Sequence, residues 1–296
     1  MELQTKVIQG SADGPHLFIT GGVHGDEYEP MAAIRRLMRE VDPSALRGKL
    51  SLTPVVNEAA FLRGTRIAED ELDLARTCPG DPGGSITERT ADALSKLIRT
   101  AEYYIDLHTG GNIMDVWPLV GYKLVPNEEV RDAQRRMAKA FNLPLVWGTD
   151  YRLEGRSLSV ARDAGVPAIY AEYMGSGKCD PAGTTAYFDG CLNVMSELGM
   201  IDRKQPASRI QYTVEDERPS AGHMQIRNPS PITGLFEPQV ELGDRIEAGD
   251  PLGTVSDVLG ENAVTVPSNE SGIVIVLRTF ARVYKDDALA VILENV

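Results

Sequence analysis

The 296-residue sequence has few cysteines, few basic residues and no long hydrophobic run. Its three cysteines, Cys78, Cys179 and Cys191, are odd in number and far apart, which indicates reduced thiols rather than a disulfide framework. No stretch approaches the roughly 18 apolar residues of a membrane-spanning helix. The first residues also lack the basic and then apolar pattern of a signal peptide. These absences exclude a membrane partner and predict a cytoplasmic location.

Basic residues are scarce relative to acidic ones: 30 lysines and arginines face 43 aspartates and glutamates, and the formal net charge is −13. Nucleic acids and anionic membranes bind proteins that present a basic surface. The composition therefore excludes nucleic acid as a partner. With 42% hydrophobic and 25% charged residues, the chain has the balance of a globular protein and is long enough for one large domain or two ordinary ones.

Strand-like and helix-like patterns alternate over the first two-thirds of the chain. Apolar, β-branched runs predict strands at 17–20, 50–56, 103–107, 145–147 and 167–173. Amphipathic segments separate them, and this alternation predicts an α/β fold with a mixed, partly parallel sheet and flanking helices. In such sheets a ligand site lies beyond the carboxyl ends of the strands.

The helix boundaries also carry sequence signals. An apolar stripe at positions 31, 34, 37 and 38 predicts a first helix that stops near Asp42 and Pro43. A capping box at 85–88 starts a second helix, and a third follows Asn127. A fourth is expected at 184–198, ending at a glycine.

The segment 21–27 (Gly-Gly-Val-His-Gly-Asp-Glu) follows the first predicted strand. Positions three apart share a helix face, so we expect His24 and Glu27 to lie on one helical turn and to reach a single metal ion. The alternative is a helix amino terminus in which Asp26, Glu27 and Glu29 complement the helix dipole.

A second histidine ends another strand, in the run Tyr-Tyr-Ile-Asp-Leu-His at 103–108. His108 would be a third ligand, and two histidines with one glutamate form a known ligand set of catalytic zinc sites. Asp106 points to the same side of the strand and would orient the His108 ring as an outer carboxylate. The alternatives are a histidine that caps the strand end and an aspartate that forms a turn.

Glu172 ends the apolar run 167–171 and precedes a glycine-rich loop. Partial desolvation there would raise its pKa, which suits a general base in metal-assisted hydrolysis. A glutamate at an exposed strand terminus is the alternative reading.

The connection 57–80 is long and contains apolar residues throughout, which favours a functional loop over a disordered one. Its arginines suit recognition of a carboxylate or an oxyanion. Pairing with the neighbouring acidic residues at 69–71 is the alternative for any one arginine.

Together these motifs resemble the succinylglutamate desuccinylase/aspartoacylase family, a branch of the zinc carboxypeptidase superfamily. They comprise His-Gly-Asp-Glu after the glycine pair, Gly-Thr-Arg and Asp-Leu-x-Arg in the segment that Asn57 opens, Asp-Leu-His-Thr-Gly-Gly, and the strand that ends in Glu172. Their order and spacing match over essentially the whole chain.

The resemblance implies a carboxypeptidase-like fold and one zinc ion per chain. It implies zinc ligands at His24, Glu27 and His108, and Glu172 as the general base. By the same resemblance, Arg66 would polarise the scissile carbonyl and stabilise the oxyanion. Arg76 would hold the substrate carboxylate, with Asn57 assigned to substrate binding as well.

One position departs from the family pattern. Members usually read Asp-Leu-Asn-Arg where this chain has Asp73-Leu74-Ala75-Arg76, so an amide that helps to hold the substrate carboxylate is missing. The departure leaves the zinc chemistry intact and puts the substrate in doubt.

Beyond about residue 205 the sequence becomes glycine-punctuated and β-rich. Residues 232–253 resemble half of a biotinyl or lipoyl barrel, and 271–289 echo that half. The candidate carrier hairpin, 257–263, contains no lysine. We predict a hydrolase domain at 1–205 and a small all-β barrel-sandwich domain at 206–296. The latter would shield the active-site mouth or form a subunit contact in a homo-oligomer.

The predicted function is therefore a zinc-dependent hydrolase of linear amide bonds that removes an acyl group from a small N-acyl amino acid. Acetyl is favoured, because the resemblance is closest to deacetylase-like bacterial members such as those acting on N-acetyl-diaminobutyrate. A metallocarboxypeptidase acting on short peptides is a near alternative. A non-catalytic small-ligand-binding protein with a vestigial metal site is another, and only Ala75 favours it.

Overall fold

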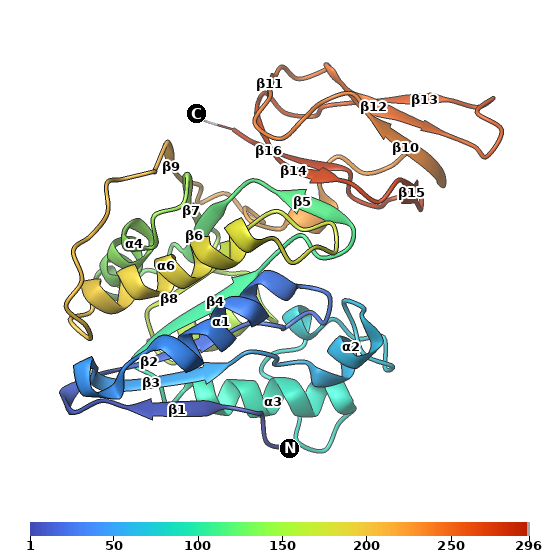
Figure 1. Cartoon of the computed structure of the whole chain (residues 1–296). Coiled ribbons are helices and arrows are strands. Elements are labelled where there is room, and N and C mark those ends of the chain that lie inside the picture. The colour runs from blue at the N-terminus through green and yellow to red at the C-terminus, as the bar shows by residue number, and fades with distance from the viewer. Residues whose placement is uncertain (295–296) are drawn as a thin grey trace.

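An eight-stranded mixed sheet forms the centre of the computed structural model, which describes residues 1–294 (Figure 1). The strand order is β1-β3-β2-β4-β8-β6-β7-β9. These strands are β1 (Lys6–Gln9), β2 (Ala12–Thr20), β3 (Arg47–Thr53), β4 (Tyr103–His108), β6 (Leu119–Lys123), β7 (Leu145–Thr149), β8 (Ala168–Glu172) and β9 (Tyr212–Glu215). Only the β1/β3 and β8/β6 pairs are antiparallel within this sheet. The prediction of a mixed, partly parallel sheet is confirmed.

Helices cover both faces of the sheet. Three pack on one face: α1 (Tyr28–Glu40), α4 (Glu128–Phe141) and α6 (Pro181–Glu197). Two lie on part of the other: α3 (Ile86–Ile98) and α5 (Ser157–Asp163). The predicted capping box is present in α3, where the Ser85 backbone N–H donates to Glu88 Oε2 at 2.7 Å. The connection 57–80 contains α2 (Glu58–Arg63) and the 3₁₀ turn η2 (Leu74–Arg76).

Alternation along the strands separates an apolar face from a functional one. Ile105 and Leu107 of β4 are fully buried in the core beneath α1, α4 and α6. Burying each such side chain contributes about 2 kcal/mol. Their neighbours Asp106 and His108 point to the opposite face, as successive strand residues must. The polar residues of β4 and β8 therefore share one face of the sheet.

The C-terminal region forms two smaller sheets. The first has the order β13-β12-β10-β15, built from β10 (Gly234–Pro238), β12 (Pro251–Ser256), β13 (Val264–Pro267) and β15 (Arg282–Val283). The second contains β11 (Arg245–Ile246), β14 (Gly272–Arg278) and β16 (Ala290–Leu293), and β14 also pairs with β5 (Met114–Val116). The barrel-sandwich form and the boundary between residues 205 and 206 remain predictions.

The C-terminal sheet that contains β14 and β16 lies against the central sheet, and the other C-terminal sheet lies farther out (Figure 1). Ile275 and Val276 of β14 pack on Leu119 and Leu145 of β6 and β7. These β14 residues cover the part of the central sheet's functional face that α3 and α5 leave open. The junction between α5 and β14 is thus where a cavity forms.

Several predicted boundaries shift. The strand expected at 50–56 runs from Arg47 to Thr53, because Pro54 follows it. The helix expected from residue 184 begins at Pro181, because the Asp180 side chain caps it. Strand β6 was not predicted. No helix within residues 1–294 has the length and apolar character needed to cross a membrane.

Candidate functional site

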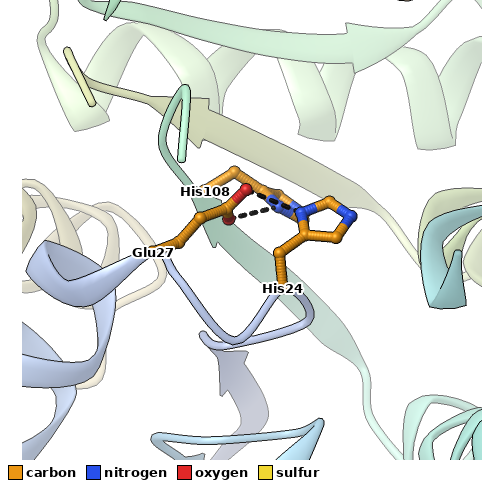
Figure 2. A group of neighbouring side chains, drawn as sticks. All are labelled: His24, Glu27 and His108. Atoms are coloured by element: carbon orange, nitrogen blue, oxygen red, sulfur yellow. Dashed lines mark hydrogen bonds and ion pairs between the residues drawn. The ribbon is translucent and has the colours of Figure 1, made fainter. Parts of the chain in front are cut away.

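Two histidines and a glutamate meet at the carboxyl ends of β2 and β4 (Figure 2). His24 Nδ1 lies 2.6 Å from Glu27 Oε1, and His108 Nδ1 lies 3.0 Å from Glu27 Oε2. One ligand atom from each residue lies within 4.8 Å of the others, and all three residues are buried. The structure therefore brings together the three residues that the sequence suggested as ligands.

The route by which His24 and Glu27 converge differs from the prediction. They do not share a helical turn, because α1 begins at Tyr28 and Glu27 is its N-cap residue. A non-helical turn joins His24 to Glu27 instead, and it passes close to α2. A Cβ at Gly25 would lie 2.1 Å from the Ala60 carbonyl carbon, so only glycine fits there.

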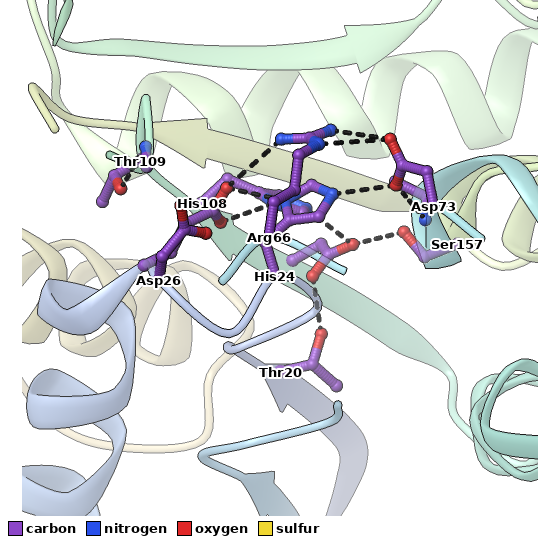
Figure 3. A network of polar contacts seen from close by, with 12 residues as sticks. Thr20, His24, Asp26, Arg66, Asp73, His108, Thr109 and Ser157 are labelled. Atoms are coloured by element: carbon purple, nitrogen blue, oxygen red, sulfur yellow. Dashed lines mark hydrogen bonds and ion pairs between the residues drawn. The ribbon is translucent and has the colours of Figure 1, made fainter. Parts of the chain in front are cut away.

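Each histidine also contacts an outer carboxylate (Figure 3). His24 Nε2 lies 3.1 Å from Asp73 Oδ1, and His108 Nε2 lies 3.1 Å from Asp106 Oδ2. Thr20 Oγ1 donates to Asp106 Oδ1 at 2.8 Å, and Ser157 Oγ donates to Asp106 Oδ2. The structure thus places Asp106 beside His108. Asp73 is an equivalent partner that the sequence analysis did not identify.

These contacts fit a bound metal ion. Donation of the Nε2 proton to a carboxylate leaves each Nδ1 lone pair directed at the centre of the cluster, an arrangement typical of metal-binding histidines. Burial opposes ionisation of Glu27, but the electrostatic attraction and hydrogen bonds of the His24 and His108 rings outweigh it and lower the Glu27 pKa. Glu27 is therefore an anionic oxygen ligand between two nitrogen donors, a set that suits transition-metal ions.

Glu172 lies beside this cluster. The strand register pairs it with His108 across β4 and β8, on the same face of the sheet. Its side chain is buried, and within residues 1–294 its Oε2 atom has no hydrogen-bond partner. Burial raises the pKa of Glu172 to about 8, and the nearby Glu27 charge adds to the rise. The residue is positioned and electrostatically suited to exchange protons near neutral pH.

Arg66 and Arg76 reach the same cavity from the connection 57–80. Arg66 Nη2 donates to Asp73 Oδ2 at 2.9 Å, and its Nη1 atom lies 3.9 Å from Glu27 Oε1. Burial opposes the charge on Arg66, but Asp73 and Glu27 outweigh it and raise the pKa. Burial, with the nearby Arg156, lowers the pKa of Arg76 to about 10.

Asn57 does not line the cavity. Its Oδ1 atom accepts the Ala60 N–H at 3.1 Å and caps α2. A direct role in substrate binding stays a prediction, and the observed role is to begin the helix against which Gly25 packs.

The cavity extends away from the cluster over β6 and β7. The further polar residues that line this part include Lys123, Arg156 and Tyr170. The sequence analysis missed all three. The available signal was a lysine inside the apolar run 119–125, which is unusual unless the ammonium group has a function. The wall is apolar and includes Met224 and Val276 from the C-terminal region.

The fold and the site together define a mixed α/β protein with a candidate metal centre at the carboxyl edge of its sheet. The chain belongs to the succinylglutamate desuccinylase/aspartoacylase family, whose catalytic-domain model matches residues 13–198.

Individual relatives extend this likeness beyond the catalytic domain. The chain is 28% identical over 290 residues to the N-alpha-acetyl-L-2,4-diaminobutyric acid deacetylase of Halomonas elongata, covering 96% of this chain and 83% of that protein. A succinylglutamate desuccinylase/aspartoacylase structure from Rhodobacter sphaeroides is 27% identical with a TM-score of 0.86, covering 99% of this chain and 89% of that one. The product-bound ectoine utilization protein EutE (DoeB) of Ruegeria pomeroyi is 26% identical with a TM-score of 0.86, covering 97% and 87% respectively.

Proposed function

We propose that this protein is a zinc-dependent amidohydrolase that removes an acyl group from an N-acyl amino acid or a related small compound. The observation that carries the proposal is the buried His24–Glu27–His108 cluster with the Glu172 carboxylate beside it. The family supports deacylation, and the name of the Halomonas relative supports removal of an acetyl group from a small amino acid derivative.

The proposed zinc ligands are His24, Glu27 and His108, oriented from outside by Asp73 and Asp106. Zinc held there would supply Lewis acidity, which polarises an amide carbonyl and makes water acidic enough to react near neutral pH. With only three protein ligands, a zinc ion held there would be able to accept a further ligand.

The protein's own groups would carry the proton transfers. Glu172 takes a proton from the attacking water as the water oxygen bonds to the amide carbon. It then delivers that proton to the nitrogen as the carbon–nitrogen bond breaks, so that a free amine and a carboxylic acid leave. Arg66 stabilises the negative charge that develops on the carbonyl oxygen, and Asp73 holds the guanidinium in place. Arg76 holds the carboxylate of the amino acid.

We also propose that residues 206–296 form a barrel-sandwich domain that completes the cavity. The contact of Val276 with the cavity and the packing of β14 on β6 and β7 support this role. A subunit contact in a homo-oligomer and a cytoplasmic location remain part of the proposal.

The decisive experiment compares wild type with Glu172→Gln. The variant should keep its fold and its zinc, measured by circular dichroism and elemental analysis. It should lose about 10³-fold in kcat, because general acid–base catalysis contributes about 10²–10⁴. Amine release is measured with a panel of N-acyl amino acids.

Glu237→Gln is the matched control, because Glu237 is exposed on β10. Wild-type turnover by Glu172→Gln would remove Glu172 from the mechanism. Zinc-loaded wild type that releases amine from no member of the panel would overturn the proposed function itself.

A further inference from the structure

A tyrosine hydroxyl group from α6 reaches the strand end that carries His108. Tyr187 is fully buried in the core between α6 and the central sheet. Its hydroxyl group donates a hydrogen bond to the His108 carbonyl oxygen. Because the His108 ring lies on the functional face of the sheet, Tyr187 contacts the backbone of this candidate ligand from the opposite side.

Packing alone does not account for this hydroxyl group. The buried stripe of α6 has no exposed surface at four positions, Tyr187, Cys191, Val194 and Met195, and the other three side chains are apolar. A phenylalanine ring would fill nearly the same space in the stripe. A buried hydroxyl group is costly unless it is hydrogen-bonded, so its role lies with its partner, the His108 carbonyl group.

The Tyr187 ring also contacts the strand end that carries Glu172. Its centroid lies 6.1 Å from that of the Tyr173 ring, and the two planes make an angle of 69°. Tyr173 follows Glu172 directly and packs closely on α6, where a Cβ at Gly183 would lie 2.8 Å from Tyr173 Cδ1. One side chain therefore contacts His108 through its backbone and Glu172 through the next residue.

Glu172 depends on such support. Within residues 1–294 its Oε2 atom has no hydrogen-bond partner, so the position of the carboxylate follows from the position of its strand end. The Gly110 N–H also donates to the Met174 carbonyl oxygen at 2.7 Å, which ties together the segments that follow the two strands. Rates depend steeply on this geometry, because a shift of about 1 Å between reacting groups can cost about 10²-fold.

We propose that Tyr187 is a positioning residue of the candidate metal centre: its hydroxyl group fixes the His108 backbone, and its ring fixes the Glu172 strand end relative to His108. Within residues 1–294 the cavity lining does not include Tyr187, so it acts through these two neighbours rather than on the substrate. The inference rests on the proposed metal site and adds to it a residue on the far side of the sheet.

The first test is Tyr187→Phe, which removes the hydroxyl group and keeps the ring. Metal-free protein is titrated with zinc in competition with a chelator of known affinity. Zinc affinity should fall about tenfold, the lower end of the effect of partners that orient metal-binding residues. Cobalt(II) bound in place of zinc should give a changed visible spectrum, because the bands follow the coordination geometry.

Tyr122→Phe is the matched control. Tyr122 is also buried, and its hydroxyl group donates to Glu215 Oε1 on β9, at the edge of the central sheet. Both variants lose one buried hydrogen bond, so both should lower the urea midpoint of unfolding by a similar amount. Only Tyr187→Phe should change the zinc affinity and the cobalt spectrum. Wild-type affinity and spectrum in Tyr187→Phe, or the same changes in Tyr122→Phe, would overturn the proposal.

Tyr173→Leu tests the ring contact and leaves the Tyr187 hydroxyl group in place. Tyr173 is half-buried, and the change removes the edge-to-face contact. The variant should keep wild-type zinc affinity but lower kcat about tenfold with KM nearly unchanged, because it loosens the base and not the ligand. Unchanged kcat would contradict the role of the ring, and this variant decides the proposal if Tyr187→Phe does not fold.

Zinc binding keeps this inference separate from the proposed function. If zinc-loaded wild type hydrolyses nothing, the proposed function fails, and the zinc affinity and cobalt spectrum of Tyr187→Phe still decide the role of Tyr187. If wild type is active and Tyr187→Phe binds zinc as wild type does, only the role of Tyr187 fails.

Discussion

The two ends of the cavity differ in how their charges are satisfied. At the cluster end, both nitrogens of His24 contact protein carboxylates, and so do both nitrogens of His108. At the other end, Lys123 has only a backbone carbonyl and Arg156 keeps a buried donor without a partner. One end is held in place before any substrate arrives. The other keeps a buried donor that no described residue satisfies.

This difference separates chemistry from selectivity. Preorganised groups cost no rearrangement at the moment of reaction, so an internally paired cluster suits catalysis. Unsatisfied cations have their largest favourable interaction with the ligand that neutralises them, so they suit discrimination between substrates. Changes at the cluster should therefore abolish activity on all substrates, and changes at the other end should alter the choice among them.

The largest effect is expected from His24→Ala. Removing one of three ligands should lower bound zinc from about one ion per chain to nearly none and reduce turnover by more than about 10⁴-fold on every substrate. Elemental analysis of protein purified without chelators or a histidine tag measures the metal. His223→Ala, a half-buried histidine outside the cluster, should keep its zinc. Equal zinc content in the His24→Ala variant and wild type would break the assignment of the cluster.

Asp73→Asn should have the next largest effect. The amide would keep the shape but weaken the contacts to His24 Nε2 and Arg66, because Asp73 accepts from both. Mutation of a carboxylate that holds a metal-binding histidine from outside changes metal affinity or activity by about 10–100-fold. Zinc titration and kcat/KM measure the change, and Asp189→Asn removes a more exposed aspartate–arginine pair as the control. An effect on only one substrate would contradict a role at the cluster end.

The cluster end could be predicted from sequence because its residues follow strand-end rules. His24 and Glu27 follow one strand, and His108 and Glu172 end two others, so a parallel arrangement brings them to one edge. Which local structure joins His24 to Glu27 could not be predicted. It depends on the close packing of Gly25 on α2, a contact between distant segments.

The other end could not be predicted, for a topological reason. Strand β6 was missed, and its antiparallel insertion between β8 and β7 carries Lys123 to the functional face. Arg156 comes from the N-cap position of α5, a short helix with no strong sequence signal. Asp73 was visible in its motif, but only the folded connection brings its carboxylate to His24.

A smaller, pH-dependent effect should distinguish Lys123 from an ordinary lysine. Burial is the main cause that lowers the pKa of Lys123; the charges of Arg156, Arg162 and Arg76 lower it further, and Asp150 raises it. With a folded-state pKa of about 7, Lys123 is charged in both states below that pH. Between pH 7 and about 10, the unfolded chain keeps a proton that the folded protein has released. The free energy of unfolding should therefore rise with pH over this range.

Lys123→Met should remove that rise. Relative to the variant, wild type should gain about 2 kcal/mol of stability between pH 6.5 and 8.5, because the linkage slope approaches 1.36 kcal/mol per pH unit. Urea denaturation at several pH values measures the difference. The control is Lys139→Met, an exposed change on α4, whose free energy of unfolding should vary with pH as that of wild type does. Parallel curves for Lys123→Met would mean that Lys123 is not a buried, titrating group in solution.

The smallest expected effect tests the wall between the two ends. Val276 and Val274 are both buried on β14, but a register shift between them puts Val276 at the cavity and Val274 in the C-terminal core. Each Val→Ala change should cost about 1–3 kcal/mol of stability, because each removes buried methyl groups. Only Val276→Ala should also raise KM, by roughly threefold, if about one of the two lost carbons contacts substrate, since one buried CH₂ is worth about 0.8 kcal/mol. Equal KM values in the two variants would show that β14 supports the fold of the C-terminal region without shaping the substrate site.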